Sequence, residues 1–305
     1  MWEIFLKTLP FFGLIGLGWG AGQLRFFPAE ATAWLTKFVF YFALSAMLFR
    51  FTATLPLEEL FDPAFFAAYL TGSFLVWIIG FTVAKARTRP LAEAAMEAHT
   101  TMTGNTGFLG VPMLVVLLGP KAAGPVLMVL AADMIVFSTL ITLIITYARH
   151  GRVAFAPLAL GLVKNPMIVS MVAGLAWALL HLPMPGPLDE FTKLLGAAAT
   201  PGALFAIGAS LAGRSAEKVG PAIWLSAAKL FLHPLAVAIA ALLIFPVEPF
   251  SAGVMIAAAA LPVAGNVYIL AAHFSVAPQR VSSAILFSTA VSILTIPAVI
   301  AWVHQ

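Results

Sequence analysis

The chain has 305 residues, of which 62% are hydrophobic and only 9% are charged. A soluble domain carries about 25% charged residues, so this composition excludes a water-facing globular protein and indicates one that lies in lipid. The absence of cysteine excludes disulfides and thiolate metal sites, and the net charge of +4 gives no indication of nucleic-acid binding.

Short polar segments divide the chain into expected membrane spans. A spanning helix needs about 20 mostly apolar residues, and nearly every window of this chain meets that requirement. The first apolar run reaches Gly20 and no basic residues precede it, so we expect a retained span there and not a signal peptide. The ten expected spans are 3–22, 31–50, 64–85, 91–118, 123–148, 163–181, 190–212, 219–245, 250–275 and 279–303.

The distribution of Lys and Arg predicts the orientation, because short cytoplasmic loops are enriched in these residues. Counted from the N-terminus, the odd loops hold ten of them and the opposite side holds four. We therefore expect the odd loops in the cytoplasm and both termini outside. The ten are Arg25, Lys85, Arg87, Arg89, Arg149, Arg152, Lys164, Arg214, Lys218 and Arg280, and the four are Lys7, Arg50, Lys121 and Lys193.

The second half of the chain resembles the first. Because five spans is an odd number, a second copy enters the membrane upside down, so we expect two inverted five-helix repeats at 1–150 and 151–305. A shift of 156 residues superposes Pro10 on Pro166, Gly18 on Gly174, 36–37 on 192–193 and 48–49 on 204–205; a shift of 161 superposes 104–105 on 265–266, and a shift of 150 superposes 137–139 on 287–289.

Glycine and proline interrupt spans four and nine, in "TMTGNTGFLGVP" from Thr101 and "LPVAGNVYIL" from Leu261. In hydrocarbon an unpaired backbone group costs several kcal/mol, so irregular backbone survives only inside protein or beside a cavity. A tolerated kink explains one such span. The matched pair favours two helices that break near the midplane and cross, with Pro112 and Pro262 at the breaks.

A broken helix exposes backbone dipoles inside the membrane. The N-terminal end of each second half carries roughly half a positive unit charge and free N–H groups, so it accepts a carboxylate without a Lys or Arg. Asn105 and Asn266 are expected to cap these ends or to bond the ligand, and Thr106 and Tyr268 add hydroxyl groups. Together with Gly104 and Gly265, these residues form the predicted anion site.

Two ionisable residues lie deep in the expected spans, Asp133 in span five and Lys229 in span eight. Such residues are functional candidates by default. They could pair with each other as a structural contact, titrate, or bind a coupling ion, and these alternatives stay open.

The other polar residues give weaker indications. We expect Glu97 and His99 to face a vestibule or the headgroups, and His233 to satisfy the carbonyl that Pro234 frees. Asn165 and Pro166 indicate a helix start. Lys7, Lys37 and Lys193 are expected near span edges, with their ammonium groups reaching water.

The motifs do not indicate an enzyme, a metal or a cofactor, because the sequence has no spaced catalytic pair, metal-ligand set or phosphate loop. A passive channel is the main rival to a carrier. It would need a continuous polar stripe along the pore, whereas the sequence shows polar residues only near the middle of the interrupted spans.

Several longer segments resemble one known family along nearly the whole chain. They are "KFVFYFALSAMLF" from Lys37, "GNTGFLGVPM" from Gly104, "LVKNP" from Leu162, "ATPGALFAIGASLA" from Ala199, "KLFLHPLA" from Lys229 and "LPVAGNVYILA" from Leu261. With these segments the sequence resembles the auxin efflux carrier family, which includes the plant PIN carriers and bacterial permeases labelled malonate transporters.

The resemblance implies an all-α fold like that of bile acid sodium symporters and sodium-proton antiporters. Helices one, two, six and seven would form a scaffold, and helices three to five and eight to ten would form a transport part, often in a homodimer. The implied activity is elevator-type transport of a small organic anion, such as malonate or an auxin-like indole acid, with sodium or proton coupling as a further option. A carrier of another substrate class is the alternative.

The resemblance also implies site residues. Asn105 and Thr106 match the substrate-contacting region of one crossover, and Asn266, Val267 and Tyr268 match that of the other. Pro112 and Pro262 match the crossover prolines. The loop at 149–164 is short, unlike that of the plant carriers, which favours a bacterial inner-membrane protein. Together with the distribution of Lys and Arg, this places both termini in the periplasm as an expectation.

Overall fold

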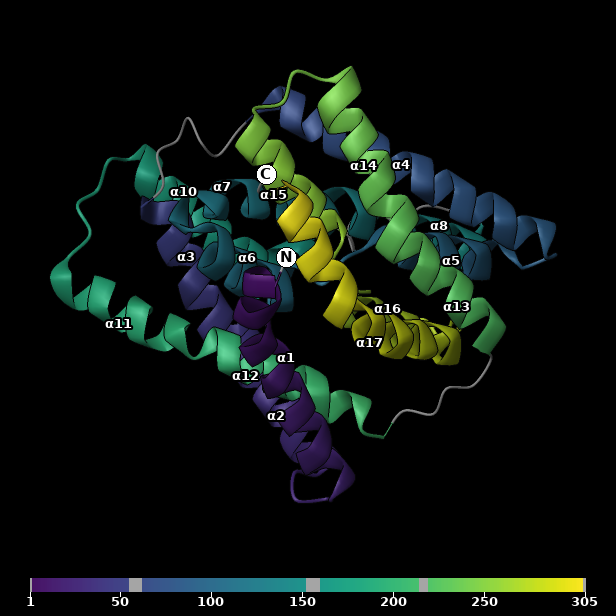
Figure 1. The fold of residues 1–305 in the computed structure, drawn as a ribbon, viewed down its shortest axis with the longest axis horizontal. Coiled ribbons are helices and arrows are strands. Elements are labelled where there is room, and N and C mark those ends of the chain that lie inside the picture. The colour runs from purple at the N-terminus through teal and green to yellow at the C-terminus, as the bar shows by residue number, and fades with distance from the viewer. Residues whose placement is uncertain (1, 55–61, 152–159, 214–218, 304–305) are drawn as a thin grey trace.

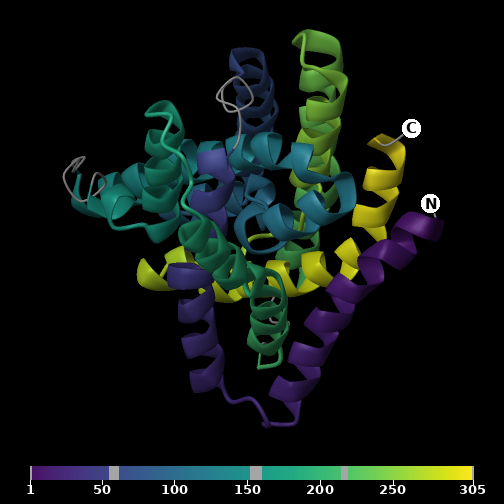
Figure 2. The same ribbon diagram turned by 90° about the vertical axis from the view of Figure 1, so that its left-hand side faces the viewer.

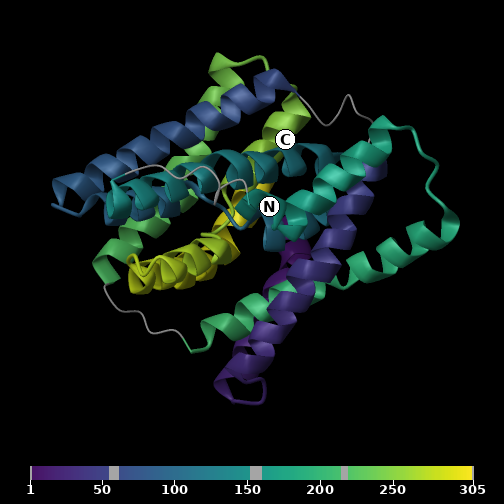
Figure 3. The same ribbon diagram turned by 180° about the vertical axis from the view of Figure 1, so that it is seen from behind.

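The computed structural model describes residues 2–54, 62–151, 160–213 and 219–303, so the predicted loop residues Arg152, Arg214 and Lys218 lie outside it. The described residues form helices, and seven of these helices are long and apolar enough to cross a membrane; three shorter apolar helices accompany them. The protein is therefore an all-helical, multi-pass membrane protein. Its two described ends lie close together in all three ribbon views (Figures 1, 2 and 3).

In the first half, each long apolar run begins and ends at polar or proline-containing loops. For example, the carboxylate of Asp62 accepts hydrogen bonds from the N–H groups of Ala64 and Phe65 at the start of α4. The elements are α1 (Trp2–Gln23), α2 (Ala29–Phe38), η1 (Val39–Ala43), α3 (Leu44–Thr54), α4 (Pro63–Ala86), α5 (Leu91–Met102), η3 (Thr106–Gly110), α6 (Val111–Leu118), η4 (Pro120–Ala122), α7 (Ala123–Ala132), η5 (Asp133–Phe137) and α8 (Ser138–His150).

In the second half, the predicted helix start at Asn165 is confirmed, because its side chain accepts a hydrogen bond of 3.0 Å from the N–H of Met167. The elements are α10 (Pro166–Leu179), α11 (Gly186–Ala197), α12 (Ala199–Leu211), α13 (Val219–Ala227), η6 (Ala228–Leu232), α14 (His233–Ile239), η7 (Ala240–Ile244), α15 (Pro249–Ala259), α16 (Gly265–His273) and α17 (Pro278–Val303).

The helices pack in two groups (Figure 1). Group A contains α1 to α3 and α10 to α12, in which α1 packs along α12 and α10 along α3. Group B contains α4 to α8 and α13 to α17; within it α4 packs against both α5 and α14. The contacts of α1 with α6 and α17, and of α12 with η3, join the two groups.

Glycine permits the close helix pairs of group A. A Cβ atom at Gly18 of α1 would lie 2.1 Å from the carbonyl oxygen of Phe205, and one at Gly174 of α10 would lie 2.5 Å from that of Phe49. Small residues at such contacts let helix backbones approach closely in lipid, where packing drives association. The 156-residue shift superposes both the two glycines and the two phenylalanines.

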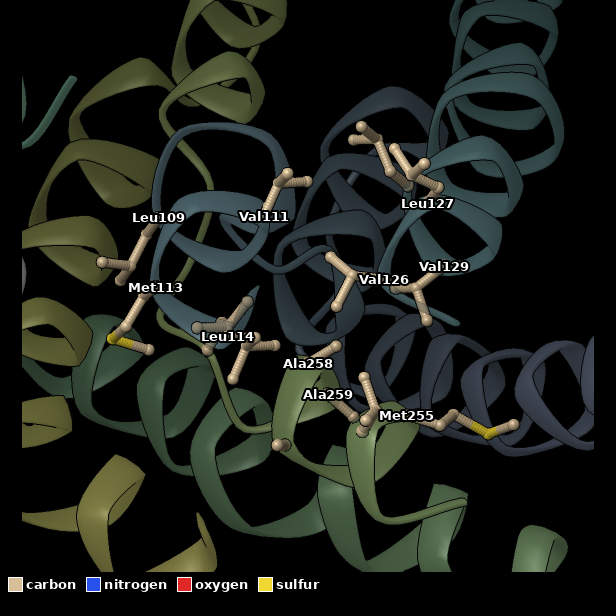
Figure 4. Packing of buried hydrophobic residues seen from close by; sticks show 14 of the residues in the cluster. Leu109, Val111, Met113, Leu114, Val126, Leu127, Val129, Met255, Ala258 and Ala259 are labelled. Atoms are coloured by element: carbon tan, nitrogen blue, oxygen red, sulfur yellow. The ribbon is translucent and has the colours of Figure 1, made fainter. Parts of the chain in front are cut away.

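An apolar core surrounds the short helices of group B (Figure 4). Met113 and Leu114 of α6 and Val126 of α7 are fully buried there, next to Ala258 and Ala259 of α15. The small alanine side chains allow α15 to lie close to its neighbours. This packing holds the ends of the short helices deep inside protein.

Candidate functional site

Both predicted interruptions are present. In the fourth segment α5 ends at Met102 and η3 begins at Thr106; in the ninth, α15 ends at Ala259 and α16 begins at Gly265. Each interruption therefore leaves one helix C-terminal end and one helix N-terminal end in the interior of group B.

The two interruptions are joined directly by backbone hydrogen bonds. The N–H of Asn105 donates to the carbonyl of Pro262 at 2.9 Å, and the N–H of Ala264 donates to that of Thr103 at 3.2 Å. Between these bonds, Gly104 and Val263 form an isolated antiparallel bridge. The bridge pairs backbone N–H and C=O groups that lipid could not pair. It thereby stabilises extended backbone between the helices. We call the paired segments 103–105 and 262–264 the crossing.

The two Gly-Asn pairs do not lie opposite each other in the crossing. Gly104 lies opposite Val263 and not opposite Gly265. Asn105 is the N-cap residue of η3, whereas Asn266 lies inside α16, whose N-cap residue is Ala264. Neither η3 nor α16 has a side-chain cap, so of the two roles expected for the asparagines capping is excluded and ligand binding stays a prediction.

The two prolines also differ. Pro262 lies in the interruption and its carbonyl accepts the bond from Asn105. Pro112 lies near the start of α6, beyond the π-helical turn η3, so the expectation that it marks a break is wrong. In η3 the N–H groups of Leu109 and Gly110 both donate to the carbonyl of Asn105, which is how the wide turn replaces regular helical bonding before the proline.

Glycine at position 104 leaves room for a buried lysine. A Cβ atom there would lie 3.3 Å from both the Nζ of Lys229 and the carbonyl oxygen of Ala258. Lys229 is fully buried, and its ammonium donates to the carbonyl of Ala259 at the C-terminal end of α15. A cation at this position complements the negative end of the helix dipole.

Asp133 takes the complementary position at a helix N-terminal end. Its carboxylate accepts hydrogen bonds from the hydroxyl of Tyr69 at 2.7 Å and from that of Thr106, the first residue of η3, at 3.5 Å. Asp133 and Lys229 form no ion pair with each other within the described residues. Asp133 instead lies at the positive N-terminal end of η3, and Lys229 lies at the negative C-terminal end of α15.

Two expectations for buried polar residues are wrong. His233 does not serve a carbonyl freed by Pro234; its ring nitrogens lie 3.1 Å from Lys229 Nζ and 2.9 Å from Ser73 Oγ. Glu97 does not face a vestibule, because it is buried in an ion pair with Arg280, which also contacts Glu93.

A cavity of about 690 Å³ lies beside the crossing and between the two helix groups. Gly104, Asn105 and Asn266 line it, as does Gly107 in the first turn of η3. The N-terminal ends of η3 and α16 therefore both reach its wall. Further polar lining comes from Lys37, Tyr41, His99, Thr103, Asp133, Ser138, Asn165 and His273.

Comparison with known proteins is consistent with this architecture. A family model described as "Membrane transport protein" matches residues 3–156 and 152–300. A protein of Rhizobium meliloti (strain 1021) named "Putative malonate transporter" is 33% identical over 302 residues, which cover 97% of this chain and 94% of the relative. The chain belongs to the auxin efflux carrier family of membrane transporters. It is a transporter and not an enzyme.

Only some of the predicted site residues of the transporter line the cavity. Thr106 bonds to Asp133, and Val267 is buried in an apolar cluster against which Tyr268 packs. Neither these three residues nor Gly265 is among those that line the cavity. The predicted residues that do line it are Gly104, Asn105, Asn266 and Asp133.

Sequence reasoning missed the side of the transporter's cavity that group A supplies. Lys37 and Tyr41, from the continuous helix 29–54, line the cavity, although we expected Lys37 at a span edge. The "KFVFYF" segment contains both residues and was the available signal. Lys193, which the 156-residue shift superposes on Lys37, is not among the residues that line the cavity, and its Nζ lies 3.7 Å from the carboxylate of Glu190.

Proposed function

We propose that the protein is a secondary transporter of small organic anions, with malonate-like carboxylates as its substrates. One observation carries this proposal: two half-helix N-terminal ends, joined through the crossing, reach the wall of one cavity. Apart from Val267, which donates to the Ala264 carbonyl, their first-turn N–H groups have no acceptor within their own helices, so a carboxylate can accept hydrogen bonds from them. The name of the relative from Rhizobium meliloti supports malonate as the first candidate.

We further propose ten spans in two inverted five-helix repeats. The three shorter apolar segments, two of them extended across the crossing, complete the seven long helices to ten. The equivalent contacts of Gly18 with Phe205 and of Gly174 with Phe49 support a twofold relation between the halves.

Alternating access follows from the two helix groups in this proposal. Group A corresponds to spans one, two, six and seven and acts as a scaffold, while group B carries the crossing. The cavity lies between the groups, so movement of group B past group A would open it first to one side and then to the other. During such a movement the N-terminal end of η3 keeps Asp133 and the C-terminal end of α15 keeps Lys229, because these residues all lie within group B.

The excess of Lys and Arg in the odd loops supports an orientation with both termini in the periplasm of a bacterial inner membrane. Coupling to sodium or protons and assembly as a homodimer stay predictions of the resemblance, and Asp133 and Lys229 stay the candidates for coupling or support.

The test of the site uses Asn105→Leu and Asn266→Leu, with Thr82→Leu, an exposed position on α4, as the matched control. Binding of malonate to purified protein raises its apparent thermal stability by mass action. We expect this shift in the wild type and the control, and its loss in both asparagine variants, which should still unfold cooperatively. An unchanged malonate affinity in both variants would contradict the proposed site.

Counterflow in liposomes separates a carrier from a channel. Unlabelled malonate inside the vesicles should accelerate uptake of labelled malonate, since a loaded carrier returns faster than an empty one. Uptake that is indifferent to internal malonate would favour a passive channel.

A further inference from the structure

Lys37 is the one lysine or arginine among the described residues that line the cavity. It forms no ion pair within the described part of the chain, and its Nζ lies 4.2 Å from the ring centroid of Trp34. The other cations deep in group B have oxygen partners: Lys229 has the Ala259 carbonyl, and Arg280 has two carboxylates. Lys37 itself is an exposed residue at the cavity, so its ammonium is accessible to a ligand there.

The position of Lys37 gives the cavity two separate positive poles. One pole is the N-terminal end of α16 in group B, since Asp133 already lies at that of η3, and the other is the ammonium on the 29–54 helix in group A. An anion with a single carboxylate can occupy one pole only. An anion with two carboxylates can satisfy both at once, because charge-assisted hydrogen bonds form at each end.

We propose that Lys37 binds the second carboxylate of a dicarboxylate and so selects dicarboxylates over monocarboxylates. The inference rests on the proposed anion site, and it assigns the substrate class and the residue that sets it. While the site is empty, the ammonium makes a cation–π contact with Trp34, an exposed ring that is not among the residues lining the cavity. The flexible stem of lysine then lets the ammonium leave the indole for the carboxylate.

The experiment compares dicarboxylates with monocarboxylates of equal carbon number: malonate with propionate, succinate with butyrate, and glutarate with valerate. Dissociation constants are measured by calorimetry on purified protein. The variants are Lys37→Met, Lys37→Gln and Lys37→Arg, with Lys193→Met as the matched control, because Lys193 is the repeat counterpart outside the cavity.

We expect the wild type and Lys193→Met to bind at least one dicarboxylate tighter than its partner. Lys37→Met and Lys37→Gln should lose about tenfold or more in affinity for that dicarboxylate, as for a lost hydrogen bond to a charged group. Their affinity for the monocarboxylate should not change, which also shows that they are folded. Lys37→Arg should retain most of the preference.

Two results would overturn the inference while leaving the proposed function intact: equal wild-type affinities for the members of every pair, or an equal loss for both members in the Lys37 variants. Absence of binding of any of the six acids to the wild type would instead overturn the anion site itself, and the inference with it.

Discussion

At the scale of single residues, ionisable side chains deep in group B have defined partners. Lys229 donates to Ala259, Asp133 accepts from Tyr69, and Arg280 contacts Glu93 and Glu97. A charge removed from water is costly unless a partner and hydrogen bonds compensate it. These contacts therefore let charged side chains occupy positions that lipid alone would not tolerate.

Arg280 allows a direct test of this compensation. Arg280→Met should lower the free energy of unfolding by about 3–5 kcal/mol, because it leaves the buried Glu97 carboxylate without its main partner. Glu97→Gln in the same chain removes the uncompensated charge and should recover part of the loss. Lys193→Met, which breaks an exposed pair, should change stability by less than about 1 kcal/mol.

The measurement is denaturant unfolding in detergent micelles. If the double variant were as unstable as Arg280→Met alone, the loss would come from packing of the arginine stem and not from the charge.

At the scale of helices, the interruptions were predictable but their register was not. Gly104, Gly107 and Pro262 weaken regular helical hydrogen bonding, so their clustering in two spans indicated the breaks. The pairing of Gly104 with Val263 depends on backbone groups, which every residue carries, and so it leaves no side-chain signature. Matching the two Gly-Asn pairs by residue type therefore does not reveal which residues pair across the crossing.

The cavity wall illustrates the same limit. Asn105 and Asn266 were predicted from the dipole argument and do line the cavity. Lys37 was assigned to a span edge because its distance from the end of its span was the only information available. That it shares a cavity with the crossing depends on how α2 packs, and a single sequence does not contain that contact.

The helix pairs of group A lead to a prediction at this scale. Gly18→Ala would place a methyl group 2.1 Å from the Phe205 carbonyl, so α1 and α12 must separate, and we expect a loss of about 1–3 kcal/mol. Gly13→Ala on the same helix meets no atom within 4 Å and should be neutral or slightly stabilising, since alanine favours helix.

Thermal unfolding of the two α1 variants in the same detergent measures the difference. Gly174→Ala, which meets the Phe49 carbonyl, should behave like Gly18→Ala. Equal midpoints for Gly13→Ala and Gly18→Ala would show that the α1–α12 contact can relax freely.

At the scale of the whole molecule, the proposed mechanism requires group B to move past group A. The rings of Phe40 in η1 and Phe108 in η3 are stacked across the boundary between the groups, with centroids 6.2 Å apart. The rings of Phe27 and Phe205 lie 5.0 Å apart on the α1–α12 side, within group A. These two contacts provide a matched pair of sites for cross-linking.

We predict that a short thiol cross-linker between cysteines at 40 and 108 abolishes malonate counterflow, while one between cysteines at 27 and 205 does not. The chain has no native cysteine, so each reagent acts only at the introduced pair. Counterflow by the same double variants before cross-linking sets the baseline. Full activity of the cross-linked 40–108 protein would contradict movement between the groups.

The crossing has a consequence for how new transport specificities can arise. Its two hydrogen bonds use peptide N–H and C=O groups, and these do not change when a neighbouring side chain is replaced. Residues that line the cavity can therefore change during evolution, or in an engineered library, without breaking the hydrogen bonds between the two segments of the crossing. Such proteins can acquire new substrates through substitutions of cavity-lining residues, while the crossing keeps the helix N-terminal ends in the same place.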